Sequence, residues 1–167
     1  MVEAQIHIAS KEILAALESV SDPEIPVLTV MDLGVVRRVQ ETDGIVEVDL
    51  TPTYSGCPAM DTMAADITTA LNKIGYKVKM KLVMSPAWST DWISDEGRRK
   101  LEEYGVAAPL SEELDLQALL GGERIVKCTN CQSTNTKMIS QFGSTACKAL
   151  FKCEDCLEPF DYFKCLK

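Results

Sequence analysis

Two pairs of closely spaced cysteines near the end of the chain constrain its fold more than any other feature. The first pair is Cys128-Thr-Asn-Cys131 and the second is Cys153-Glu-Asp-Cys156. A CxxC turn places two sulfurs on one side of a tight loop, and two such turns supply the tetrahedral set of four thiolates that zinc prefers in structural sites. The stretch between the pairs is long enough for a hairpin. We therefore predict a zinc ribbon whose metal ligands are these four cysteines.

The four-cysteine pattern leaves the identity of the metal open. Zinc is the ion that we predict, but iron in a rubredoxin-like site uses the same ligands. A unit as short as residues 123–167 cannot be stabilised by apolar burial alone, so we expect the metal to hold its fold together.

Two further cysteines, Cys147 and Cys165, lie in the same region without a CxxC partner. Both belong to apolar strand patterns, so the simpler interpretation is that they are small buried side chains. A second metal or cluster site is the alternative interpretation.

The sequence has none of the features of a secreted or membrane protein. No apolar run approaches the ~18 residues that span a bilayer, and the first residues lack the basic start and apolar stretch of a signal peptide. We therefore expect a cytoplasmic protein with no membrane partner, in which the seven cysteines stay reduced. Disulfide pairing is the less favoured alternative.

Charge is distributed unevenly along the chain. Residues 1–121 hold 10 basic and 20 acidic side chains, a net charge of −10, whereas residues 122–167 hold 7 basic and 5 acidic, a net charge of +2. A domain with a charge of −10 repels phosphate backbones, so we do not expect nucleic acid as a partner.

The first part of the chain alternates between helical and strand periodicity. Ser10 is a suitable cap for a helix that carries Ile13 and Leu17 on its apolar face, and Asp43-Gly44 is a hairpin turn motif. A second helix carries an apolar stripe formed by Met63, Ile67, Leu71 and Ile74. The predicted elements are a helix at 10–19, strands at 34–40 and 46–50, a helix at 58–75, a strand at 77–83 and a helix at 91–104.

This order, α-β-β-α-β-α, predicts a small α+β domain with a three-stranded mixed sheet and helices on one face. We assign it to residues 1–105. A stretch with Gly, Pro and acidic residues, 106–122, is predicted to be a linker, and residues 123–167 form the zinc ribbon.

Cys57 is the single cysteine of the first domain and lies immediately before the second predicted helix. The free N–H groups and the dipole of a helix start favour an anion, so we expect a lowered pKa and a thiolate that acts as a nucleophile or soft-metal ligand. The alternative is an inert cysteine buried in a turn. A cysteine–histidine hydrolase is not expected, because the one histidine, His7, lies far away in the sequence.

Asp22 and Glu24 flank Pro23 in a loop after the first predicted helix. They are candidates for metal ligands or supporting acids that approach Cys57. The alternative is a solvated turn in which the proline ends the helix.

Several segments together resemble known families. They are Asp22-Pro-Glu-Ile-Pro26, Asp32-Leu-Gly34, residues 51–58 with their Gly-Cys-Pro, and Ser85-Pro86. Over about residues 10–105 the chain resembles the SufT-like family of α+β domains, which is associated with iron–sulfur protein maturation. With residues 142–150 and 158–163 added, the whole chain resembles the PaaD family of accessory subunits of bacterial phenylacetyl-CoA epoxidase systems.

The resemblance implies a non-catalytic maturation role in aerobic phenylacetate degradation. The epoxidase is a multicomponent di-iron monooxygenase with an iron–sulfur flavin reductase, and the accessory subunit is proposed to help insert or repair a metal centre. Cys57 then matches the reactive cysteine of the family, a transient ligand for iron or an iron–sulfur cluster, and Asp22 and Glu24 match its acidic motif. The implied partners are the oxygenase and reductase components or iron–sulfur assembly proteins. The alternative function is a docking subunit with no role in metal transfer.

Overall fold

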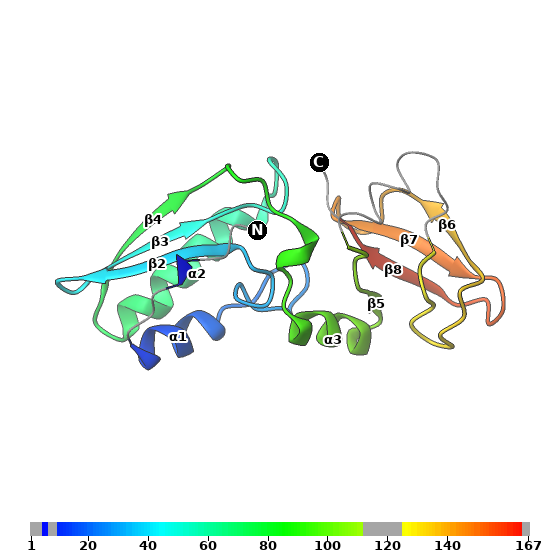
Figure 1. Cartoon of the computed structure of the whole chain (residues 1–167), viewed down its shortest axis with the longest axis horizontal. Coiled ribbons are helices and arrows are strands. Elements are labelled where there is room, and N and C mark those ends of the chain that lie inside the picture. The colour runs from blue at the N-terminus through cyan, green and yellow to red at the C-terminus, as the bar shows by residue number, and fades with distance from the viewer. Residues whose placement is uncertain (1–4, 7–9, 112–124, 165–167) are drawn as a thin grey trace. The chain divides into compact units, whose positions relative to one another are not determined.

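The computed structural model describes residues 5–6, 10–111 and 125–164. These residues form two compact units, Met1–Trp88 and Ser89–Lys167, which can be followed by colour in Figure 1. The expectations for His7 and Cys165 lie outside the described residues. None of the helices in the described part of the chain is both long and apolar enough to cross a bilayer.

The first unit has the predicted α+β architecture. Its elements are β1 (Gln5–Ile6), α1 (Lys11–Glu18), β2 (Val36–Thr42), β3 (Ile45–Leu50), α2 (Ala59–Lys73) and β4 (Lys77–Leu82). The sheet order is β1-β2-β3-β4, with β2 and β3 antiparallel and the other two pairs parallel. The three predicted strands are therefore joined by a fourth, β1, whose two residues are too few to show a periodicity in the sequence.

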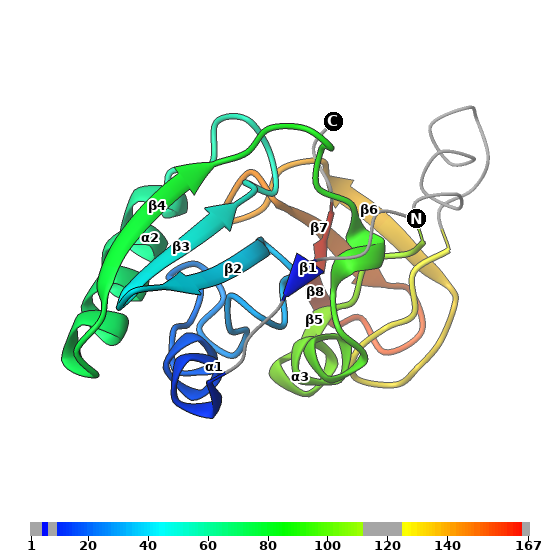
Figure 2. The ribbon, with the colours of Figure 1, turned by 60° about the vertical axis from the view of Figure 1, so that its left-hand side comes forward.

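The core of the first unit lies between the sheet and the two helices, which cover one of its faces (Figure 2). Its buried side chains come from α1, β2, β3, α2 and the loop between α1 and β2, and they include Ile13, Leu17, Val39, Val46, Val48, Leu50, Met63, Ile67 and Leu71. Ile74 is the exception to the predicted stripe, because it lies beyond the last helical turn and is 39 % exposed.

Two local predictions about this unit have different outcomes. Asp43 and Gly44 both have positive φ angles, 50° and 76°, as the predicted two-residue hairpin turn requires. Ser10 does occupy the N-cap position of α1, but its side chain accepts no capping hydrogen bond. The expected side-chain cap of this helix is therefore wrong.

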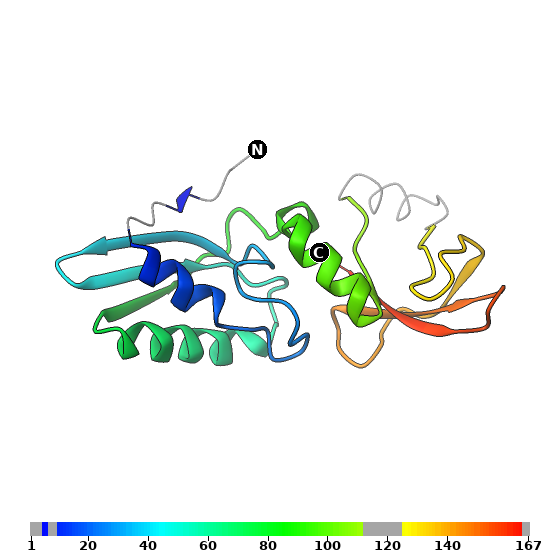
Figure 3. The ribbon, with the colours of Figure 1, turned by 90° about the horizontal axis from the view of Figure 1, so that it is seen from below.

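The second unit begins with a short helical turn, η1 (Thr90–Trp92), and the helix α3 (Asp95–Tyr104). The sequence predicts a single helix here, but the chain is interrupted at Ser94, whose side chain accepts a hydrogen bond of 2.9 Å from the N–H of Gly97 and so starts a new helix. The strands are β5 (Val106–Ala107), β6 (Thr136–Ser140), β7 (Lys148–Cys153) and β8 (Pro159–Phe163). They form a sheet in the order β5-β8-β7-β6. In Figure 3 the chain can be followed by colour from the green helix α3 to the yellow, orange and red strands of this sheet.

Residues at the start of the predicted linker belong to the sheet of the second unit. β5 pairs in parallel with β8, and Leu110 accepts a hydrogen bond from Thr90 and donates one to the hydroxyl of Tyr162. Arg98 of α3 also donates to the carbonyl of Pro109. These contacts group α3 and the following residues with the ribbon.

The core of the ribbon is built from β7 and β8. Phe151 stacks on Phe160, with ring centroids 5.9 Å apart, and meets Tyr162 edge-on at 5.5 Å. Cys128 and Cys153 are fully buried in the same cluster. Two of the four metal ligands are thus part of the apolar core of a very small unit, whereas Cys131 and Cys156 are exposed.

Candidate metal centre and thiol site

The four predicted ligands converge in the second unit. The sulfurs of Cys128 and Cys156 are 3.6 Å apart, those of Cys131 and Cys153 are 3.5 Å apart, and all four lie within 4.8 Å of one another. A tetrahedral zinc ion with Zn–S bonds of about 2.3 Å requires sulfur–sulfur distances of about 3.8 Å. The sulfurs therefore fit one tetrahedral metal ion with little rearrangement.

The two CxxC turns share one backbone geometry. Gln132 and Leu157, which follow the second cysteine of each pair, have positive φ angles of 62° and 65°. In each turn the N–H of the first cysteine donates to a carbonyl five residues later, Ser133 for Cys128 and Glu158 for Cys153, both at 2.9 Å. Each pair of sulfurs is therefore held by a closed turn.

Protons compete with a metal ion for these sulfurs. The pKa of Cys156 is lowered to about 7, mainly by the hydrogen bond from the backbone N–H of Glu158. The N–H of Ser133 also favours a thiolate at Cys131, but hydrogen bonding among the sulfurs and burial outweigh it and raise the pKa of Cys131 to about 12. A bound dication replaces these protons, so metal binding releases protons to solvent.

A metal ion held by all four sulfurs would have no open position for a substrate. Structural zinc sites have four protein ligands, whereas catalytic sites keep one position for water or substrate. Among the described residues, this is the one group of three or more Cys, His, Asp or Glu ligand atoms close enough to hold an ion. The site is therefore suited to maintain the fold of the ribbon.

Cys147 lies outside the four-sulfur group. It is buried, and its sulfur is 3.1 Å from the hydroxyl of Thr145. Its backbone carbonyl accepts a hydrogen bond from Lys164. This surrounding matches a small buried side chain, the simpler of the two interpretations of Cys147.

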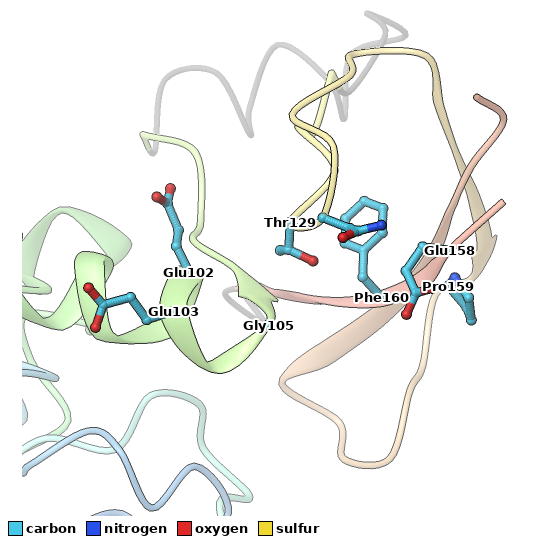
Figure 4. A pocket seen from close by; sticks show the side chains of 8 residues that line it. Glu102, Glu103, Gly105, Thr129, Glu158, Pro159 and Phe160 are labelled. Atoms are coloured by element: carbon cyan, nitrogen blue, oxygen red, sulfur yellow. The ribbon is translucent and has the colours of Figure 1, made fainter. Parts of the chain in front are cut away.

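A hollow of about 310 Å³ lies beside the first CxxC turn, between the end of α3 and the start of β8. Figure 4 shows the side chains of Glu102 and Glu103 directed away from Phe160 on the opposite wall. The hollow thus does not gather its acidic groups into one site.

Cys57 precedes α2 and is half-buried, with its N–H donating to the carbonyl of Tyr54 at 3.1 Å. Burial raises the pKa of its thiol, although hydrogen bonds from the N–H of Ala59 and from Thr53 act in the opposite direction. The negative charges of Asp22 and Glu24 raise this pKa further. The expected lowering of the pKa by the helix start is therefore wrong, because desolvation and two carboxylates outweigh it.

The acidic loop lies close enough to Cys57 for both carboxylates to act on the thiol electrostatically. Asp22 is buried, and its Oδ1 accepts hydrogen bonds from the N–H groups of Glu24 and Ile25, both at 2.7 Å. The three candidate side chains nevertheless do not form a preformed group of metal ligands. The result is a thiol beside two acids rather than a ready chelate.

Thr53 is a residue of this site that the sequence did not single out. Its side chain is hydrogen-bonded to the sulfur of Cys57, and it is buried. Its place in the 51–58 stretch, four residues before the cysteine, is the only hint in the sequence, because a loop shows no periodicity from which side-chain direction can be inferred.

The α+β unit and the four-sulfur ribbon define a two-part class of protein: an α+β domain joined to a metal-binding ribbon. Residues 10–81 match a family described as iron-sulfur cluster assembly protein, and residues 114–164 match the PaaD zinc beta ribbon domain. The second unit is thus a metal-binding ribbon, as predicted.

Similarity over the whole chain identifies the family. The chain is 46 % identical, over 97 % of its length and 94 % of the other protein, to an Escherichia coli protein provisionally named as a subunit of 1,2-phenylacetyl-CoA epoxidase. This chain belongs to the PaaD family.

Other relatives match the first unit. A Porphyromonas gingivalis Fe-S protein maturation auxiliary factor is 38 % identical over 54 % of this chain and 89 % of its own length. The crystal structure of a domain named DUF59 from Bacillus anthracis is 26 % identical, with a TM-score of 0.51, and covers 54 % of this chain and 88 % of that one. The fold of the first unit is therefore shared with proteins that match this chain over about half of its length.

Proposed function

We propose that this protein is a non-catalytic maturation factor that helps to assemble an iron–sulfur or other metal centre of a phenylacetyl-CoA epoxidase system in aerobic phenylacetate degradation. The observation that carries the proposal is the half-exposed thiol of Cys57 beside Asp22 and Glu24. The names of the relatives support the same role, since one is an epoxidase subunit and another an iron–sulfur maturation factor.

The chemistry of this thiol suits transient binding of iron. Its raised pKa keeps it protonated near neutral pH, so a metal ion must displace the proton to solvent before a sulfur–metal bond forms. The two nearby carboxylates disfavour a free thiolate but favour a cation at the sulfur. With no complete ligand set among the residues that the structure describes, the site depends on ligands from a client protein and releases its cargo to it.

The ribbon supplies the second part of the proposal. We assign zinc to its four sulfurs, because a closed tetrahedral thiolate site without redox function suits zinc. The ribbon then presents a stable surface to oxygenase or reductase components or to iron–sulfur assembly proteins. The cytoplasm, where thiols stay reduced, is the expected location.

Co-expression with the epoxidase components tests the role of the thiol. We expect Cys57→Ala to lower the iron–sulfur content of the client and the activity of the pathway. The matched control is Cys147→Ala, which removes a cysteine outside both sites and should leave both measurements unchanged. If the Cys57 variant matches wild type in both, the maturation role of this thiol is wrong.

The docking-subunit alternative makes the opposite prediction. Replacing Cys128 and Cys131 would then abolish complex formation and activity, while Cys57→Ala would leave function intact. The absence of a preformed chelate at Cys57 among the described residues is the observation that keeps this alternative in place.

A further inference from the structure

The edge of the ribbon sheet at β6 exposes apolar side chains. β6 is the last strand in the sheet order, and no strand among the described residues pairs with its other side. Met138, Ile139 and Phe142, on β6 and just after it, are 45 %, 55 % and 59 % exposed. We call these three residues, together with Lys137 and Lys152, the β6 surface.

Two lysines of the β6 surface face each other without a counter-charge. Lys137 of β6 is directly opposite Lys152 of β7, and neither makes an ion pair among the described residues. Like charges in directly opposed positions destabilise a sheet. An external carboxylate placed between them would remove this repulsion.

Phe142 is held in place although it is exposed. The ammonium of Lys164 lies 4.3 Å from the centroid of its ring, and Lys164 itself is only 4 % exposed. The hydroxyl of Ser140 donates to the carbonyl of Phe142 at 2.7 Å and accepts from its N–H at 3.2 Å. A fixed aromatic side chain loses little conformational entropy on binding, which is a property of interface anchors.

Protection of an edge strand explains only part of this arrangement. A lysine on the edge and a bulge both discourage unwanted strand pairing, and Lys137 and the register shift between Met138 and Ser140 serve that purpose. Lys152, however, lies on an inner strand, and edge protection does not call for exposed Met138, Ile139 and a fixed Phe142.

We propose that the β6 surface binds a short extended segment of a partner protein that carries a carboxylate beside an apolar side chain. The carboxylate contacts Lys137 and Lys152 on one face of the sheet, and the neighbouring apolar side chain of the segment contacts Met138 on the other face, because successive side chains of extended chains alternate. The bulge limits the docked segment to a few residues. This site does not depend on the role of Cys57, so it stands or falls separately from the proposed maturation function.

Nuclear magnetic resonance of the metal-loaded full chain tests the site with a blocked peptide of sequence Gly-Glu-Leu-Glu-Gly. The amide signals of Lys137, Met138, Phe142 and Lys152 should shift on titration. Replacing both glutamates of the peptide by glutamine should weaken binding about two- to fivefold, the range for exposed ion pairs. The binding should also weaken as the salt concentration rises.

A charge-reversed variant of the protein tests whether the two lysines recognise the peptide carboxylates. Lys137→Glu combined with Lys152→Glu should lose the Glu peptide and instead prefer Gly-Lys-Leu-Lys-Gly, with metal content and circular dichroism unchanged. The matched control is Lys77→Glu, an exposed lysine on β4, the edge strand of the other unit, which should bind like wild type.

Three results would overturn the proposal. One is that the Glu and Gln peptides bind the protein equally well. Another is that the double variant Lys137→Glu, Lys152→Glu and the control Lys77→Glu weaken binding of the Glu peptide to the same extent. The third is a spectrum that does not change when the Glu peptide is added.

Discussion

The thiol of Cys57 is subject to opposing influences from its immediate neighbours. Burial and the carboxylates of Asp22 and Glu24 favour its protonated form, whereas the N–H of Ala59 and the side chain of Thr53 favour the thiolate. The balance raises the pKa of the thiol. Such a group stays neutral in the free protein and ionises when a cation arrives, which separates it from cysteines that act as nucleophiles at neutral pH.

Glu24→Gln is expected to lower the pKa of Cys57, because it removes one negative charge that opposes the thiolate. At a fixed pH below the wild-type pKa, a larger fraction of thiolate makes the variant react faster with iodoacetamide. The pH profile of alkylation at Cys57, followed by mass spectrometry, measures this shift toward lower pH. Glu18→Gln, an exposed residue on α1, is the control, and a profile shared by both variants would contradict the electrostatic account.

For single residues, the sequence predicts which cysteines are metal ligands better than it predicts the surroundings of a side chain. The four ribbon cysteines could be identified because their spacing dictates which sulfurs meet. The pKa of Cys57 could not, because it depends on burial and on two acids more than thirty positions away in the sequence. The burial of Lys148, which is 7 % exposed, likewise depends on a loop residue, since Gly143 lies beside it and donates its N–H to the Lys148 carbonyl.

Among the structural elements, we expect the CxxC turns and β7 to depend on the metal. Chelation of the metal should unfold the ribbon strands and leave the sheet of the first unit intact, because the buried core of the ribbon includes two of the four ligand side chains, Cys128 and Cys153. Amide signals of β7 and β8, compared with those of β2 and β3, measure this difference. Ribbon signals that persist without metal would contradict it.

Metal affinity should also depend on pH with a definite sign. Binding requires thiolates, and the lower of the two shifted pKa values among the ligand sulfurs is about 7, at Cys156. Affinity therefore rises as the pH increases through 7 and falls below it, where protons compete for the sulfurs. Competition with a zinc-binding dye across neutral pH checks this, and an affinity that is constant over the range would contradict it.

The two serine N-caps provide a paired test of helix stability. Ser94 caps α3 through a hydrogen bond to Gly97, whereas the Ser10 side chain makes no capping bond to α1. Ser94→Ala should lower the free energy of unfolding by about 1 kcal/mol, and Ser10→Ala should change it by less than about 0.5 kcal/mol. Chemical denaturation of both variants measures the difference, and equal losses would contradict the assigned caps.

Across the whole chain, the order of elements and the α+β class follow from periodicity, but the grouping of elements does not. Helix α3 and residues 106–110 belong to the second unit through the bonds of Arg98 to Pro109 and of Leu110 to Tyr162. These contacts are made by backbone groups of a loop and by Tyr162, more than fifty residues further along the chain, so no pattern in the sequence predicts them. Composition alone places the change later, where cysteine and phenylalanine become frequent.

The proposed thiol site and the proposed β6 surface lie in different units of the chain. If the ribbon brings the thiol to a client protein, an intact thiol and an intact β6 surface must be present in the same molecule. Cys57→Ala and the doubly charge-reversed β6 variant should then each fail to support client maturation, for different reasons. The first should still bind the partner, and the second should still react with iodoacetamide at Cys57. When both variants are expressed together, neither supplies a docked thiol, so client cluster content should stay low. Recovery to the level of wild type would mean that docking and thiol chemistry act on separate molecules, and the coupling of the two units would be wrong.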